Sequence, residues 1–292
     1  MRRFPISGLL MLLPAFALVF LVGCPPPATN KDKDKDKVAA AADAGKDKDK
    51  TTDKGKGGAA VEITTETDGT VKGVVKFDGV PPEPKPLKAI GENKDAPMCM
   101  KGGGNHIVEQ TWLVKKDGAV ANVVISLAAP TGKKFKITDT LKKPFEQTAF
   151  MDQPFCAYTP HVMAIYADFQ PFVVKNSATL THNVNFSGGK FTAFGKNLPP
   201  AEATEAKKFE RENNPINIAC NAHTFMTAKL LTFDHPYFAV TNEDGLFEIK
   251  NAPIGEELIV YMWHESMDKK AEVQKVTLKK GDNDLSLKIS AK

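Results

Sequence analysis

The chain has 292 residues, enough for one large or two small folded domains. Its 39 basic and 35 acidic residues nearly balance, so charge gives no argument for nucleic-acid binding, and none is expected. Val, Ile, Phe and Thr recur in short runs between Gly, Pro, Asn and Asp, and helix formers show no long-range pattern. The sequence therefore predicts an all-β protein.

The chain begins with a basic and then apolar leader. Two arginines precede an apolar run over residues 8–22, which is the arrangement of an export signal. A transmembrane anchor is the alternative, but Pro14 and the abrupt end of the run argue against a stable span. The sequence Leu-Val-Gly-Cys ending at Cys24 resembles a bacterial lipobox. We therefore expect residues 1–23 to be a lipoprotein signal peptide and Cys24 to carry the lipid. In that sorting pattern Pro25, in place of Asp, favours the outer membrane or periplasmic face of the cell envelope.

Residues 24–68 contain almost no large apolar side chains. Three prolines open the segment, lysine alternates with aspartate over residues 31–37, and glycines are frequent near residues 55–58. Such a composition cannot bury enough surface to offset the entropy lost on ordering. We expect a disordered charged linker that holds a folded part away from the membrane.

Alternating apolar residues predict strands in three later regions. The first covers residues 71–79 and 121–127, the second is a run of short strands over residues 155–233, and the third covers residues 236–289. Asp244-Gly245 in the third region is typical of an antiparallel hairpin.

The segment over residues 216–226 carries the clearest chemical signal. Because Ile216, Ile218 and Cys220 alternate, a strand should direct the Cys220 sulfur inward at its end. Two residues then separate Cys220 from His223, and two more separate His223 from Met226. A type 1 copper ion needs one thiolate, two imidazoles and a weak axial thioether. This loop supplies three of those four ligands.

The fourth ligand is expected from a separate upstream strand. His182 stands in a Thr-His-Asn-Val sequence that follows an apolar strand ending in turn residues. Zinc is the rival metal, since Cys and His also bind it, but the thioether of Met226 favours copper. The alternatives to metal binding are a buried structural thiol at Cys220 and, at His182, a polar residue at a strand end whose hydrogen bonds are made within the protein. The sequence predicts one copper ion held by His182, Cys220, His223 and Met226.

These motifs resemble the cupredoxin family over about residues 156–233, and the short ligand loop is most similar to that of amicyanin. The resemblance implies a Greek-key β-sandwich and single-electron transfer to a redox partner protein. It also implies that Asn183 tethers the ligand loop by hydrogen bonds. His223 would be the exit route for the electron, being nearest the surface in that family. A copper-dependent nitrite reductase would need further His ligands, and no pattern for them is found, so we do not expect an enzyme.

Two further cysteines, Cys99 and Cys156, remain in a chain that we expect to be exported. A disulfide between them is the default in an oxidising compartment. Alternatively, Met98, Cys99, Met100 and His106 would form a second, soft Cu(I) site. The segments around both cysteines look like loops.

Three other histidines are interpreted structurally. His161 stands at a strand start and could lie near the copper, but such histidines are mostly structural and it is not assigned as a ligand. His235 and His264 are expected to pack and form hydrogen bonds between domains.

Residues 238–255 resemble a carboxypeptidase regulatory-like (prealbumin-like) β-sandwich in an Asp-Gly turn, an F-x-I strand and a Pro-x-Gly turn. They amount to about half of such a domain. We hypothesise that a cupredoxin-like unit over residues 148–235 is inserted into this companion sandwich, whose first strands lie in residues 69–147 and whose remainder is residues 236–292. The alternative assigns residues 69–147 to the cupredoxin-like unit and leaves a partial sandwich at the end.

The first functional expectation is a membrane-tethered electron carrier at the cell envelope. The second is a copper-binding or delivery protein without a redox partner, and the third is a metal-free surface scaffold.

Overall fold

A computed structural model of the protein describes residues 59–189 and 194–291. The predicted signal peptide, the lipid attachment site Cys24 and most of the predicted linker lie outside the described residues. Those residues belong to a single compact unit, 55–292. Strands dominate it, so the prediction of an all-β protein built from β-sandwiches is confirmed. No helix among the described residues has both the length and the apolar character needed to cross a bilayer.

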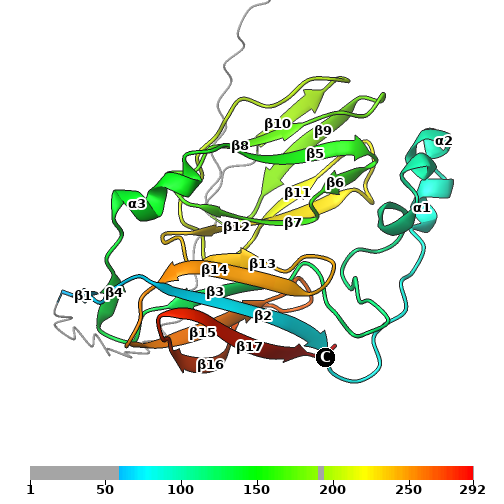
Figure 1. Ribbon diagram of the computed structural model, residues 1–292. Coiled ribbons are helices and arrows are strands. Elements are labelled where there is room, and N and C mark those ends of the chain that lie inside the picture. Colours follow the sequence, from blue (N-terminus) through cyan, green and yellow to red (C-terminus); the bar gives the residue numbers. More distant parts are fainter. Residues whose placement is uncertain (1–58, 190–193, 292) are drawn as a thin grey trace, which may run out of the picture. The chain divides into compact units, whose positions relative to one another are not determined.

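The region that carries the candidate ligands forms two sheets that pack face to face (Figure 1). The larger has the order β10-β9-β11-β12-β7, and the smaller has the order β6-β5-β8. The bounds of these strands are β5 Ala149–Phe155, β6 Ala157–Thr159, β7 Val162–Tyr166, β8 Phe172–Lys175, β9 His182–Ser187, β10 Phe194–Leu198, β11 Ile216–Ala219 and β12 Thr227–Phe233. We call this part the ligand sandwich.

Strand alternation builds the core of the ligand sandwich. In β11, Ile216 and Ile218 are buried while Asn217 is exposed, as the period of two requires. Phe172 and Val174 of β8 enter the same core from the opposite sheet. Cys220 and Met226, which flank the ligand loop, belong to it as well. The expected ligands therefore lie at the end of a packed hydrophobic core.

A second pair of sheets combines strands from early and late parts of the chain. One has the order β14-β2-β17 and the other the order β13-β3-β15-β16. Their bounds are β2 Gly69–Phe77, β3 Val124–Ala128, β13 Phe238–Val240, β14 Leu246–Ala252, β15 Glu257–Trp263, β16 Ala271–Thr277 and β17 Gly281–Ile289. We call this part the companion sandwich; its assignment as an insertion-split prealbumin-like domain with the boundaries given above stays a prediction.

Close backbone approach in the companion sandwich explains one of its glycines. A Cβ at Gly73 of β2 would lie 2.4 Å from the Leu285 carbonyl oxygen and 2.5 Å from the Phe247 ring. Glycine at this position lets β2 sit between β14 and β17, antiparallel to the first and parallel to the second. The core of this sandwich is a separate hydrophobic cluster.

The predicted linker ends earlier than expected. Residues 61–63 form β1 (Val61–Ile63), which pairs in parallel with β4 (Lys133–Phe135), and Ile63 is buried. The prediction that the disordered segment runs to residue 68 is wrong for these residues. Burial of the Ile63 side chain and hydrogen bonding to β4 can offset the entropy that residues 61–63 lose on ordering.

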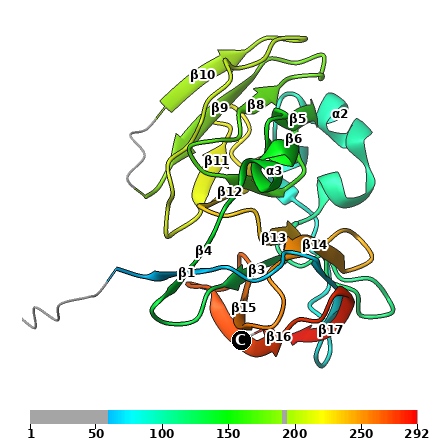
Figure 2. The ribbon, with the colours of Figure 1, turned by 60° about the vertical axis from the view of Figure 1, so that its left-hand side comes forward.

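Short helical turns, not loops, surround Cys99. They are α1 (Lys88–Gly91), α2 (Ala96–Cys99), and the 3-10 turns η1 (Met100–Gly102) and η2 (Gly104–Ile107). Their ends are tied by a hydrogen bond from the Leu87 amide to the Ile107 carbonyl, 3.0 Å. Figures 1 and 2 show these turns, in cyan and green-cyan, beside β5 and β6. We call residues 87–107 the cap. Two further turns, α3 (Asp139–Lys142) and η3 (Lys143–Phe145), lie just before β5.

Candidate metal centre

The ligand loop connects β11 to β12 and is closed by its own backbone. The Cys220 amide donates to the Met226 carbonyl at 3.1 Å, and the Met226 amide donates to the His223 carbonyl at 2.8 Å. These bonds hold the side chains at positions 220, 223 and 226 on one compact turn. The strand-then-loop pattern of the sequence therefore corresponds to a well-defined local structure.

Three of the four predicted ligands converge. The candidate ligand atoms of His182, Cys220 and His223 all lie within 4.8 Å of one another. The two Nδ1 atoms of the histidines are 3.1 Å apart, and the Cys220 Sγ is 3.7 Å from the His223 Nδ1. Metal–nitrogen bonds of about 2.0–2.1 Å and metal–sulfur bonds of about 2.3 Å allow a single ion to reach all three atoms. The residues present fit one transition-metal ion.

Burial suits these side chains to metal binding. His182, Cys220 and His223 are each 1 % exposed. Burial, followed by the neighbouring His223, lowers the pKa of His182 to about 4, so its imidazole is neutral at pH 7 and can offer a lone pair. The Met226 side chain is also 1 % exposed and lies in the same core cluster as Cys220. Its role as the axial thioether stays a prediction.

Asn183 connects the upstream strand to the ligand loop. Its Oδ1 accepts a hydrogen bond from the Asn221 amide at 2.7 Å and another from the Asn185 side chain at 2.8 Å. Its own amide points at the Cys220 Sγ, 3.5 Å away. The first bond is the tether that the cupredoxin resemblance implied, and the last would stabilise a thiolate.

The cap covers His223. The His223 Nε2 lies 3.2 Å from the Asp95 Oδ2. The backbone amide of Asp95 donates a hydrogen bond to the Asn93 Oδ1 at 3.0 Å, which holds Asp95 in place. Asn93 also donates to the Ala222 carbonyl in the ligand loop, at 3.4 Å. The expectation that His223 lies nearest the surface is therefore wrong, because a segment 128 residues away in sequence buries it. Its role as the exit route for an electron stays a prediction.

Sequence reasoning missed Asp95 because nothing in its local pattern marks it. It precedes Pro97 in a polar stretch, and its spacing from the ligand loop follows no motif. Only the folded chain brings its carboxylate to the imidazole. Such a carboxylate behind a ligating histidine orients the ring and makes the imidazole a stronger donor.

A disulfide joins Cys99 of the cap to Cys156 beside β5 and β6. Its sulfurs lie within 4.8 Å of a ring nitrogen of His223, although bonded sulfurs do not supply a thiolate ligand. The same bond removes the thiolate from the alternative Cu(I) site of Met98, Cys99, Met100 and His106. The disulfide and the surrounding apolar side chains of Ile90, Leu180 and Phe225 attach the cap to the ligand sandwich.

His161 links the two sandwiches and does not join the ligand group. Its Nε2 is 2.7 Å from the Glu265 Oε2, and its Nδ1 is 3.1 Å from the Thr227 carbonyl. Burial alone would raise the pKa of Glu265, but the hydrogen bonds from His161 and from Thr111 lower it to about 2. The pair is therefore a buried carboxylate–imidazole contact between the two sandwiches.

His235 and His264 also lie away from the ligand group. His264 stacks on Trp112 with ring centroids 4.0 Å apart, and its Nδ1 is 2.9 Å from the Ser266 hydroxyl. His235 contacts the rings of Phe135 and Phe233. Burial lowers the pKa of each histidine to about 4, so both are neutral packing residues near pH 7.

No protein-family model and no curated protein matches the sequence. Among solved structures, the chain is similar to a purple cupredoxin from Nitrosopumilus maritimus, with 16% identity, 29% of this chain and 99% of that one covered, and a TM-score of 0.25. A reduced amicyanin variant shows 18% identity over 37% of this chain and 99% of that one, with a TM-score of 0.27. A copper-containing nitrite reductase from Thermus scotoductus SA-01 shows 12% identity, with 30% and 22% covered and a TM-score of 0.26. Values this low do not establish a family, so the ligand geometry itself carries the functional interpretation.

Proposed function

We propose that the protein is a type 1 copper protein that carries single electrons at the cell envelope, tethered there by lipid on Cys24. The observation that supports this most is the convergence of one thiol and two imidazole nitrogens at the end of a buried core. Soft sulfur suits Cu(I) and imidazole suits Cu(II), so a bound copper ion supplies a one-electron couple that these ligands serve in both states.

The chain's own residues would keep the site rigid. His182 is carried by β9 and the other ligands by the loop after β11, and Asn183 ties these two elements together. If Met226 supplied the fourth ligand, the four side chains would hold the ion and would leave no open coordination position for a substrate. We therefore propose an electron carrier rather than an enzyme, with a redox protein as its partner.

Copper loading of the full-length protein, purified in detergent, tests this proposal. We expect one copper per chain and an intense blue colour from charge transfer between the Cys220 thiolate and Cu(II), bleached by a reductant and restored by an oxidant. The variant Cys220→Ser should keep the fold and lose the colour. The matched control His161→Gln changes a buried histidine outside the ligand group and should stay blue. Retention of colour in Cys220→Ser would refute the assignment.

One observation favours a second candidate, a copper-binding or delivery protein without a redox partner. His223 lies under the cap and has no exposed edge through which a partner would reach the copper. A stoichiometric copper complex that is colourless, or that does not cycle between oxidised and reduced forms, would support this alternative over electron transfer.

A further inference from the structure

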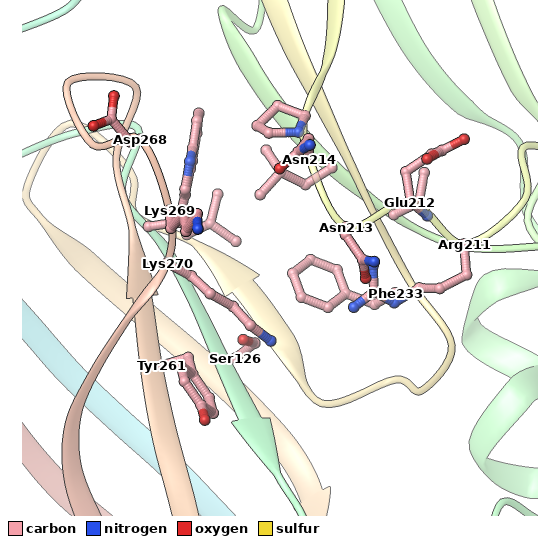
Figure 3. Close-up of a pocket in the computed structure, with 15 residues that line it drawn as sticks. Ser126, Arg211, Glu212, Asn213, Asn214, Phe233, Tyr261, Asp268, Lys269 and Lys270 are labelled. Carbon is pink, nitrogen blue, oxygen red and sulfur yellow. The ribbon is translucent and has the colours of Figure 1, made fainter. Parts of the chain in front are cut away.

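A cavity of about 380 Å³ lies between β12 of the ligand sandwich and strands β3 and β15 of the companion sandwich. Its walls include Phe233 and Tyr261, with Arg211 on one side and Lys270 on the other (Figure 3). The volume falls within the range of small-molecule sites, and such sites often occur where two folded layers meet. The copper ligands do not line it.

Two cations reach into this cavity against aromatic rings. The Lys270 Nζ is 4.3 Å from the centroid of the Tyr261 ring, and the Arg211 guanidinium carbon is 5.8 Å from that of Phe233. Among the described residues Arg211 has one ion-pair partner, the largely exposed Asp234 at 3.8 Å, and Lys270 has none. The positive charges at the cavity are therefore only partly compensated.

The acidic residues of the lining point elsewhere. Figure 3 shows the carboxylates of Glu212 and Asp268 directed away from the space between Phe233 and Lys270. The Glu212 carboxylate lies against Gly189, where an added Cβ would meet its Oε2 at 2.5 Å. Neither acidic residue of the lining therefore directs its carboxylate at the centre of the cavity, and Asp234, which pairs with Arg211, is not part of the lining.

The indole of Trp263 belongs to the buried part of the cavity wall. Trp263 lines the cavity and is 5 % exposed, and its indole Nε1 is buried with no hydrogen-bond partner within the described part of the chain. Buried donors in folded proteins nearly always have a partner, and an unpaired one requires an explanation. Burial, followed by the charge of Arg211, lowers the pKa of Lys270, whereas the nearby Asp234 carboxylate raises it. An anion placed between the two cations would offset the effect of Arg211.

We propose that this cavity binds a small aromatic carboxylate. Its carboxylate lies between Arg211 and Lys270, and its ring packs on Phe233. Charge-assisted hydrogen bonds to a guanidinium and an ammonium select an anion. The aromatic wall selects a planar apolar body over a simple inorganic ion.

Calorimetric titration of the full-length protein with naphthoate tests the proposal, with naphthamide as the uncharged analogue and acetate as the anion without a ring. We expect one naphthoate per chain, with much weaker binding of both analogues. Lys270→Gln and Arg211→Gln should each weaken naphthoate binding by about tenfold or more. Arg211→Lys, which keeps the charge, should recover part of the affinity.

The matched control is Lys116→Gln, which makes the same change on an exposed turn outside the cavity. It should leave binding unchanged. Circular dichroism checks the fold of every variant, and Lys270→Gln carries the test if Arg211→Gln fails to fold. Equal affinity for naphthamide, an equal loss in Lys116→Gln, or no binding of naphthoate would each overturn the proposal.

Discussion

Removal of the disulfide between Cys99 and Cys156 should loosen the cap and expose the metal centre. The two cysteines are 57 residues apart in sequence. Cross-linking a loop of that size lowers the entropy of the unfolded chain by an amount worth roughly 4 kcal/mol at 25 °C. Because both side chains are also buried with Ile90, the double variant Cys99→Ala/Cys156→Ala loses some packing as well. We expect the free energy of unfolding to fall by roughly 2–5 kcal/mol.

Two measurements check this prediction. Urea unfolding of the metal-free full-length protein, followed by circular dichroism, gives the loss of stability. Reduction of the copper-loaded protein by ascorbate reports access to the site and should be faster in the double variant, because Asp95 is no longer held over His223.

The control Met100→Ala truncates an exposed side chain one residue after Cys99 and should change neither quantity. A loss below about 1 kcal/mol, together with an unchanged reduction rate, would refute the view that the disulfide holds the cap.

Three further predictions concern single residues. Asn183→Ala removes two hydrogen bonds at the ligand loop and should lower the stability of the copper-loaded protein by about 1–3 kcal/mol in urea unfolding; an unchanged midpoint would contradict the tethering role. His264 is fully buried and its pKa falls from 6.5 to about 4, so the unfolded chain takes up its proton first as the pH decreases. Its contribution of roughly 3 kcal/mol to the free energy of unfolding should be present above pH 6.5 and be lost between pH 6.5 and 4. His264→Gln should make the unfolding midpoint less dependent on pH over that window. The same slope of midpoint against pH in both proteins would argue against a buried neutral imidazole. Gly245→Ala places a Cβ 2.6 Å from the Val75 carbonyl at a φ of +68° and should cost more than about 1 kcal/mol in the same assay. Gly255→Ala, at a φ of +76° but with no atom within 4 Å, should cost less, and equal losses would contradict the steric explanation.

The local order of the metal centre could be predicted from the sequence. Alternation at Ile216, Ile218 and Cys220 reports which face of a strand is buried, because the side-chain period of a strand is two residues. The spacing from Cys220 to His223 and Met226 places three donor groups on one short loop. The strand that carries His182 and its Asn-Val neighbours predict it as the fourth ligand. These inferences depend on residues that are close together in the sequence, so a single sequence is enough to make them.

The contacts that govern access to the site were decided by the tertiary structure alone. Asp95 and the cap bury His223, contrary to the expectation of an exposed ligand, and the loops expected around Cys99 are short helical turns. The cavity beside Lys270 likewise joins segments far apart in the chain. The period of a strand and the spacing of ligands are set by neighbouring residues. Packing between distant segments depends instead on the shape and charge of both surfaces, and it leaves no periodic pattern in the sequence.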